Sequence, residues 1–343
     1  MSRLFSDAGV RLPVLAAPMA GGASTTALVA AAAGVGSLGF LAGGYKTADA
    51  LAGQMDVLRT RKVPFGVNLF AGDPMPISDA DHRRYARTLQ PEADRYGLRL
   101  NHGTPVADDD GWADKIDLVM GGDVAWVSFT FGIPDQAVVR ALQRSGTTVL
   151  QNVTSPTEAR QAAEVGVDGL VVQASAAGGH SATLSPDRPP APVPLADLVA
   201  RVRRTTALPL VAAGGIATSA DAAAALRAGA DATMIGTLLL RTEESGASPA
   251  HQRALADPAF ATTVLTRAFT GRPARALRNH FTDRYDLLAP AGYPAVHHLT
   301  APLRKAAAEA GDTRLIHLWA GTGYREAKQE SAARTLERIA ARL

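Results

Sequence analysis

Cysteine is absent from the 343 residues of this chain. Its absence excludes disulfide bonds, thiolate metal sites and a cysteine nucleophile. No HExxH sequence and no carboxylate–histidine cluster with metal-site spacing occurs either, so we expect no bound metal. A chain without cysteine is compatible with the reducing cytoplasm, and we expect a cytoplasmic protein.

Long hydrophobic runs and dense basic runs are also missing. The longest apolar tract, around 27–33, is rich in alanine and too short to cross a bilayer, and the first residues lack the apolar core of a signal peptide. Lys and Arg number 35 against 32 Asp and Glu, a net charge of +3 that is spread along the chain. We therefore expect neither a membrane nor a nucleic acid as a partner.

Short segments rich in Val, Ile and Leu recur along the chain, and most are followed by a helix-start signal. Near-continuous apolar strands are typical of a parallel sheet, because helices cover its outer face. The eight predicted strands are 13–17, 36–41, 64–69, 124–129, 147–151, 167–173, 208–213 and 231–236. Eight alternating βα units indicate an α/β fold, a closed (β/α)₈ TIM barrel, with an open doubly wound sheet as the alternative.

Capping residues place the helices between these strands. Ser24 and Thr47 each precede an apolar periodic run, and Ser155 and Thr218 each begin a capping-box pattern. Residues 73–123 form a longer crossover. We expect residues 1–240 to make the barrel, completed by 311–343, and 241–310 to make a proline-broken helical insertion that forms part of the substrate pocket.

Polar and glycine residues stand where the predicted strands end, which is the catalytic face of such a barrel. Asn68, Gln151-Asn152 and Gln173 close three strands, and Met19 follows the first. Glycines leave backbone N–H groups open to close approach, and barrels of this kind commonly hold a phosphate after the last two strands. The two segments that predict a phosphate clamp are Ala213-Gly214-Gly215-Ile216 and Met234-Ile235-Gly236-Thr237.

The segment 174–194 is a long loop with little periodicity, and such loops in compact domains tend to be functional. It contains Gly178-Gly179-His180, a histidine that follows a glycine pair at the catalytic rim. We therefore predict a catalytic role for His180, whereas His297 and His298 have no comparable context. Tyr45-Lys46 and Tyr324-Arg325 are left open as pocket contributors.

At these residues the chain resembles the nitronate monooxygenase family, formerly called 2-nitropropane dioxygenases. The matching segments are Leu15–Met19, Phe65–Phe70, Gln173 with Ala177–His180, Ala212–Ile216, Ile235–Thr237, Phe269–Arg275 and Trp319–Gly323. The Ala-Gly-Gly-His tetrapeptide is the most specific of them. It is followed here by Ser181-Ala182, where the family often has Arg-Gly, which leaves the substrate open.

The resemblance implies an FMN enzyme that oxidises nitronates or nitroalkanes with O₂ to a carbonyl compound and nitrite. Asn68 and Gln173 would bind the flavin ring and ribityl chain, Met19 and Gly178 would line its pocket, and His180 would remove the proton α to the nitro group. The implied cofactor-binding set is Met19, Asn68, Gln173, Gly178, Gly179, Gly214, Gly215, Met234, Ile235, Gly236 and Thr237. Histidine suits this role because it titrates near neutral pH.

Two other functions remain open at this point. The flavin-dependent enoyl-acyl carrier protein reductases share the same motifs and would use NAD(P)H. A flavin-free isomerase or synthase with a phosphate-binding barrel would need only the two glycine clamps. No GxGxxG that opens a helix is present, so a dinucleotide site of that type is not expected.

Overall fold

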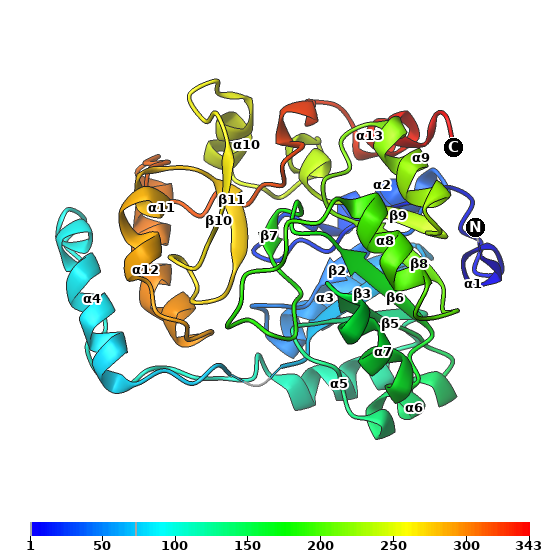
Figure 1. The fold of residues 1–343 in the computed structure, drawn as a ribbon, viewed down its shortest axis with the longest axis horizontal. Coiled ribbons are helices and arrows are strands. Elements are labelled where there is room, and N and C mark those ends of the chain that lie inside the picture. Colours follow the sequence, from blue (N-terminus) through cyan, green and yellow to red (C-terminus); the bar gives the residue numbers. More distant parts are fainter. Residues whose placement is uncertain (1, 73) are drawn as a thin grey trace.

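Eight parallel strands form the centre of the computed structural model, which describes residues 2–72 and 74–343 (Figure 1). Each predicted strand segment overlaps one of them. The strands are β1 (Val14–Ala16), β2 (Phe40–Ala42), β3 (Gly66–Phe70), β4 (Trp126–Thr130), β5 (Thr148–Val153), β6 (Gly169–Gln173), β8 (Leu210–Ala213) and β9 (Ala232–Ile235). Apolar side chains fill these strands on both faces, as a sheet covered by helices requires.

The strands are hydrogen-bonded in the order β1-β9-β8-β6-β5-β4-β3-β2. A parallel bridge between Ala16 and Gly39 brings the two ends of the sheet together, so the barrel is nearly closed. This arrangement confirms the (β/α)₈ barrel and not the open sheet. Inside it, Phe5 stacks on Trp126 with ring centroids 5.3 Å apart and closes the N-terminal end with an apolar plug.

Helices alternate with the strands and cover the barrel wall. They are α2 (Thr26–Gly34), α3 (Ala48–Thr60), α5 (Trp112–Met120), α6 (Gln136–Arg144), α7 (Pro156–Val165), α8 (Leu195–Arg203), α9 (Ser219–Arg227) and α13 (Ala332–Ala340). The short helix α1 (Arg3–Ser6) precedes the barrel. No helix in residues 2–72 and 74–343 is long and apolar enough to cross a membrane.

Three of the four N-cap residues predicted from the sequence are confirmed. Thr47, Ser155 and Thr218 accept a hydrogen bond from the first turn of their helices. The prediction that Ser24 begins α2 is wrong by one residue, because Thr25 is the N-cap. Ser24 instead accepts a hydrogen bond of 2.8 Å from the backbone N–H of Met19, and so fixes the loop after β1 at the catalytic face.

Residues 241–310 cover the C-terminal mouth of the barrel and are called the lid here. The lid has helices α10 (Pro249–Ala256), α11 (His280–Tyr285) and α12 (Ala295–Glu309), with 3₁₀ turns η1 (Thr237–Arg241) before it and η2 (Asp286–Leu288) within it; η3 (Tyr324–Glu326) follows later. It is not purely helical as expected. The β-branched run Thr263–Thr266 forms β10, which pairs with β11 (Ala274–Leu277), and β11 pairs with the short strand β7 (Gly179–His180).

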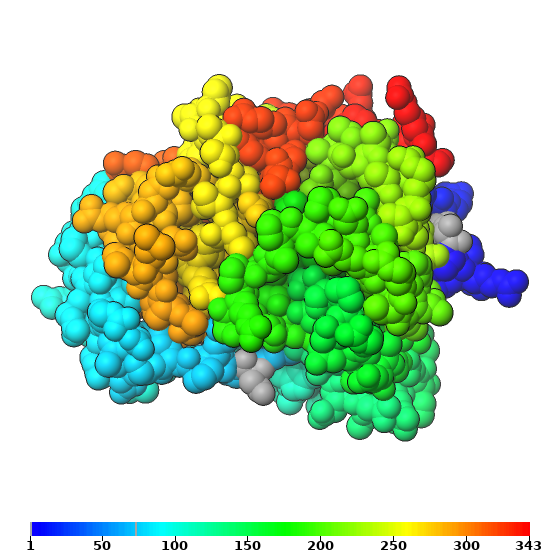
Figure 2. Space-filling model, in the orientation of Figure 1, coloured from blue at the N-terminus to red at the C-terminus, as the bar shows by residue number. Residues whose placement is uncertain are grey.

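Helix α4 (Asp79–Asp94), in the crossover after β3, lies away from the barrel wall and beside α12 of the lid (Figure 1). Its buried side chains Tyr85 and Leu89 share a hydrophobic cluster with Leu299 and Leu303 of α12. In the space-filling view α4 and the lid together make up the half of the molecule opposite α6 to α9 (Figure 2). The lid is therefore packed against a second, separate stretch of the chain.

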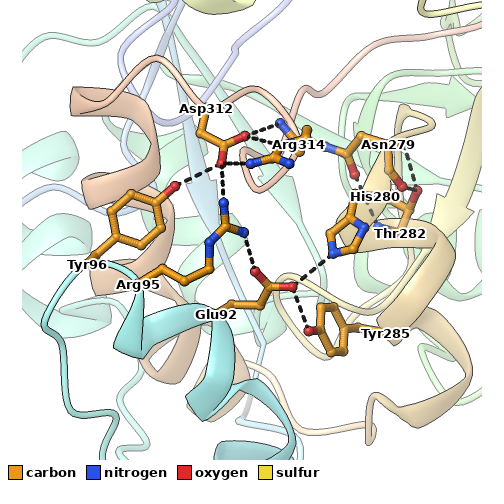
Figure 3. Close-up of polar contacts among 9 residues, drawn as sticks. All are labelled: Glu92, Arg95, Tyr96, Asn279, His280, Thr282, Tyr285, Asp312 and Arg314. Atoms are coloured by element: carbon orange, nitrogen blue, oxygen red, sulfur yellow. Dashed lines mark hydrogen bonds and ion pairs between the residues drawn. The ribbon is translucent and has the colours of Figure 1, made fainter.

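A polar network fastens α4 to the lid (Figure 3). The buried carboxylate of Glu92 lies 2.8 Å from His280 Nε2 and accepts a hydrogen bond of 3.0 Å from the Tyr285 hydroxyl. Nearby, the Tyr96 hydroxyl donates to Asp312 at 2.9 Å. Burial raises the pKa of Glu92, but the hydrogen bonds from His280, Arg95 and Tyr285 outweigh it and leave that pKa below its usual value.

Candidate active site

A cavity of about 440 Å³ opens at the C-terminal ends of the barrel strands, under the lid. The structure brings to it every cofactor-binding and catalytic residue predicted from the sequence. Those lining residues are Met19, Asn68, Gln173, Gly178, Gly179, His180, Gly214, Gly215, Met234, Ile235, Gly236 and Thr237. The glycine clamps and His180 therefore line one and the same cavity.

The glycine clamps present backbone donors to this cavity. Gly214 and Gly215 adopt φ angles of 99° and 81°, which side-chain-bearing residues rarely reach. A Cβ on Gly215 would lie only 3.0 Å from the Ala176 side chain. Within the described residues, the N–H groups of Gly214, Gly215 and Gly236 make no hydrogen bond. Glycine N–H groups that line a cavity and have no partner can bind anions such as phosphate.

Asn68 is buried on β3 and lines the same cavity from the part of the barrel opposite β8. Its Nδ2 donates to Ser128 Oγ at 2.9 Å and to Thr130 Oγ1 at 3.0 Å, both on β4. The neighbouring strand thus fixes the amide orientation. The carbonyl oxygen Oδ1 is the atom left for a ligand.

Gln173, at the end of β6, holds the loop that carries the histidine. Its Nε2 donates to the carbonyl of His180 at 3.2 Å, and its Oε1 accepts from the Ala182 N–H at 2.8 Å. Further along, Glu158 of α7 accepts from the hydroxyl of Thr183 at 3.0 Å instead of completing the capping box expected at Ser155. A half-buried amide and a buried carboxylate therefore fix the loop, at His180 and Ala182 in one case and at Thr183 in the other.

The imidazole of His180 lies among the rings of Phe131, Tyr293 and Trp319, with centroid distances of 5.6, 5.7 and 5.3 Å. Its Nε2 is 2.9 Å from the hydroxyl oxygen of Thr270, which in turn donates to the carbonyl of Arg272 at 3.3 Å. A carbonyl oxygen can only accept, so the Thr270 proton is directed to it, and the hydroxyl oxygen accepts from His180. The proton of neutral His180 is then on Nε2, which leaves Nδ1 as the basic atom.

Burial, followed by the positive charges of Arg272 and Arg304, lowers the pKa of His180 to about 3. His180 is therefore a neutral imidazole at neutral pH and can accept a proton. Arg272 stacks on the ring of Phe131 at 4.0 Å and, within the described residues, bonds carbonyl oxygens and no carboxylate. The site thus combines an unprotonated base with two buried cations, which favour negative charge on a bound molecule.

Two residues that line the cavity have strained backbones. Tyr45 and Phe131 adopt φ angles of 64° and 83°, in the left-handed region that bulky residues avoid. The N–H of Tyr45 is held by Asp110 Oδ1 at 2.9 Å, and its ring stacks on His297 with centroids 4.3 Å apart. Strain of this kind persists where the surrounding packing fixes a functional geometry.

Several cavity residues were not predicted from the sequence. Arg304, His251 and His317 reach the cavity from α12, α10 and the segment before η3. The open candidates Lys46 and Tyr324-Arg325 do not line it. Lys46 Nζ bonds Ala42 O and Gln54, and the Tyr324 hydroxyl bonds Phe260 O.

A barrel whose strand ends bring glycine N–H groups without partners and a neutral histidine into one cavity has the architecture of an enzyme active site. Residues 3–341 match the family model described as nitronate monooxygenase. The chain therefore belongs to the nitronate monooxygenase family and is an oxidoreductase.

Individual relatives agree with this assignment. A probable nitronate monooxygenase of Staphylococcus saprophyticus is 34% identical, over 98% of this chain and 96% of that protein. A probable nitronate monooxygenase of Bacillus subtilis is 30% identical, over 98% of this chain and 97% of that protein. Among solved structures, a nitroalkane oxidase from Streptomyces ansochromogenes is similar with a TM-score of 0.94 and 47% identity, covering 99% of this chain and 97% of that one. FabK from Thermotoga maritima gives a TM-score of 0.76 and 26% identity, covering 99% and 94%.

Proposed function

We propose that this protein is an FMN enzyme that oxidises alkyl nitronates, and nitroalkanes after their deprotonation, with O₂ to a carbonyl compound and nitrite. The observation that carries the proposal is one cavity that holds a neutral histidine at one position and a set of glycine N–H donors at another. Family membership and the similarity to a nitroalkane oxidase structure support the same reaction class.

The residues present fit FMN. The backbone N–H groups of Gly214, Gly215 and Gly236 would hold a terminal phosphate. Asn68 Oδ1 would accept a hydrogen bond from the ring or the ribityl chain, and Met19 would pack against the ring. The flavin, when bound, would supply the electron-accepting chemistry that no side chain of this protein can provide.

His180 would act on neutral nitroalkanes. Its Nδ1 would take the proton from the carbon that bears the nitro group, while Thr270 keeps the other nitrogen protonated. The nitronate anion formed in this way would be stabilised by Arg272, Arg304 and the new imidazolium charge. A preformed nitronate would need no base, so His180 would then serve only to position it.

An oxygen electrode tests the proposal directly. The purified protein should release FMN on denaturation, consume O₂ with a panel of nitronates and produce nitrite. NAD(P)H should not be oxidised when an enoyl thioester is added, which separates this function from the enoyl reductase alternative. A colourless protein that does not bind FMN would instead favour the flavin-free barrel function.

A further inference from the structure

Arg304 is a buried cation on the cavity wall. Its side chain is 6% exposed and lines the cavity from helix α12. Within the described residues its hydrogen bonds reach one hydroxyl, two imidazoles and one carbonyl, and none reaches a carboxylate. A buried charge without a counter-ion is costly, so an anion that binds beside it is strongly favoured.

The guanidinium carries more donors than its neighbours use. It has five N–H bonds. Nε donates to Thr300 Oγ1 at 3.0 Å, Nη1 to His317 Nδ1 at 3.2 Å, and Nη2 to both Nδ1 and the carbonyl of His297. One N–H on Nη1 therefore has no partner within the described residues.

These contacts also fix where His317 carries its proton. A guanidinium can only donate, so Nδ1 of His317 accepts and the neutral ring is protonated at Nε2. Burial, followed by the charge of Arg304, lowers the pKa of His317 well below its usual value and keeps the ring neutral. His317 lines the cavity, and its Nε2–H makes no hydrogen bond within the described part of the chain. Arg304 thus orients a second donor.

We propose that Arg304 and His317 form a subsite for a small planar oxyanion at the lid end of the cavity. The oxygens of a nitro or nitronate group and of nitrite share this chemistry. The naming of these ligands depends on the proposed function, whereas the anion site itself depends only on the arrangement of the donors. Arg304 attracts the anion by its charge, and the Nε2–H of His317 orients it by a hydrogen bond. Both interactions are stronger in a cavity that partly excludes water.

A purely structural role for Arg304 is the competing explanation. Its bonds to Thr300, His297 and His317 do tie α12 to the segment before η3. Asparagine or glutamine could make similar bonds to neutral acceptors without the cost of burying a charge. The charge and the remaining donors are the features that a structural role does not use.

Nitrate is the probe for the test, because it is planar and carries the same oxygen geometry. Nitrate titration of the purified holoprotein would be followed by calorimetry and by tryptophan fluorescence, to which Trp319 contributes with its ring 5.2 Å from that of His317. Arg304→Leu and His317→Phe should each weaken nitrate binding by about 10- to 100-fold, as expected for loss of a charged hydrogen bond. Lys328→Met is the matched control, since this lysine is exposed and does not line the cavity, and it should change binding less than about 3-fold.

The mode of inhibition identifies the occupant. Competitive inhibition of nitronate oxidation by nitrate would assign the subsite to the substrate oxygens, and mixed inhibition would assign it to released nitrite. No nitrate binding by the unmodified protein, or equal binding by the His317→Phe variant, would overturn the subsite. Because binding is measured without turnover, this result is independent of whether nitronates are oxidised. His317→Phe leaves Arg304 in place, so the test survives if Arg304→Leu does not fold.

Discussion

Replacement of His180 by asparagine should separate two activities that share one active site. The amide would keep a polar side chain at the rim but could not accept a proton at neutral pH. With a neutral nitroalkane such as nitroethane, the variant loses the proton acceptor. With preformed ethylnitronate, the proton is already gone. The ratio of the two rates therefore reports the base function alone.

The magnitude follows from the contacts of the imidazole. General-base catalysis typically contributes about 10²- to 10⁴-fold, and we expect a loss in this range with nitroethane. Thr270→Val removes the hydrogen bond that keeps the proton on Nε2 but leaves the ring in place. That bond is worth about 0.5–1.5 kcal/mol, which corresponds to about a 2- to 12-fold loss with nitroethane. Thr270→Ser keeps the hydroxyl and should restore most of the rate.

Steady-state O₂ uptake with each substrate, on protein checked for bound flavin, measures both ratios. Equal losses with nitroethane and ethylnitronate would show that His180 positions the substrate and is not chiefly a base. A Thr270→Val rate equal to that of the unmodified protein would refute the assignment of Nδ1 as the basic atom. Loss of flavin from either variant would show up as loss of colour before any assay.

Three further predictions follow from the same geometry. The pKa of His180 is lowered to about 3, so the base is unprotonated above that pH. Protonation of His180 should therefore not lower kcat/KM for nitroethane between about pH 8 and about pH 5. A decline in kcat/KM centred near about pH 6.5 would contradict the lowered pKa of His180. Gly215→Ala forces a Cβ to 3.0 Å from Ala176 at a φ of 81°, so FMN affinity measured by fluorescence titration should fall at least about 10-fold, whereas Gly146→Ala, also at positive φ but with open space around it, should leave it unchanged. The pKa of Glu92 is lowered in the folded protein, so its ionised form stabilises the fold at pH values above the pKa of the unfolded state, and this stabilisation is lost as the pH falls through the pKa of the folded state. Glu92→Gln should lower the free energy of unfolding by about 1–3 kcal/mol and raise hydrogen exchange in α4. Unchanged exchange in α4 would refute the role of the network in Figure 3.

The barrel was predictable because its strands carry their own signal. Segments such as Leu170–Val172 are apolar on both faces, and a helix-covered parallel sheet buries them fully. The glycine clamps and His180 were predictable for a related reason. In a parallel barrel every strand ends at the same face, so their order along the chain already places them together.

The lid was less predictable because its contacts are long-range. Strands β10 and β11 are short, and β11 pairs with the loop strand β7, which lies about a hundred residues earlier in the sequence, so no local pattern predicts this pairing. Helix α4 reads as an ordinary crossover helix, yet its apolar face packs on α12 and not on the barrel. Arg304 and His317 were missed for the same reason. The role of an arginine on an amphipathic helix and of a histidine in a coil becomes visible only when the fold brings the lid and the segment before η3 together.

The low pKa of His180 does not conflict with its role as a base. Proton transfer from a nitroalkane creates an imidazolium and a nitronate in the same step, so the net charge of the cavity does not change. Arg272 and Arg304 disfavour the imidazolium, but they favour the adjacent anion, and the new ion pair favours both partners. A cation near the histidine would only weaken the base if no anion formed beside it. Among the described residues Arg272 and Arg304 bond no carboxylate, so their charges remain available to the anion that forms in the cavity. They therefore stabilise the nitronate that His180 produces.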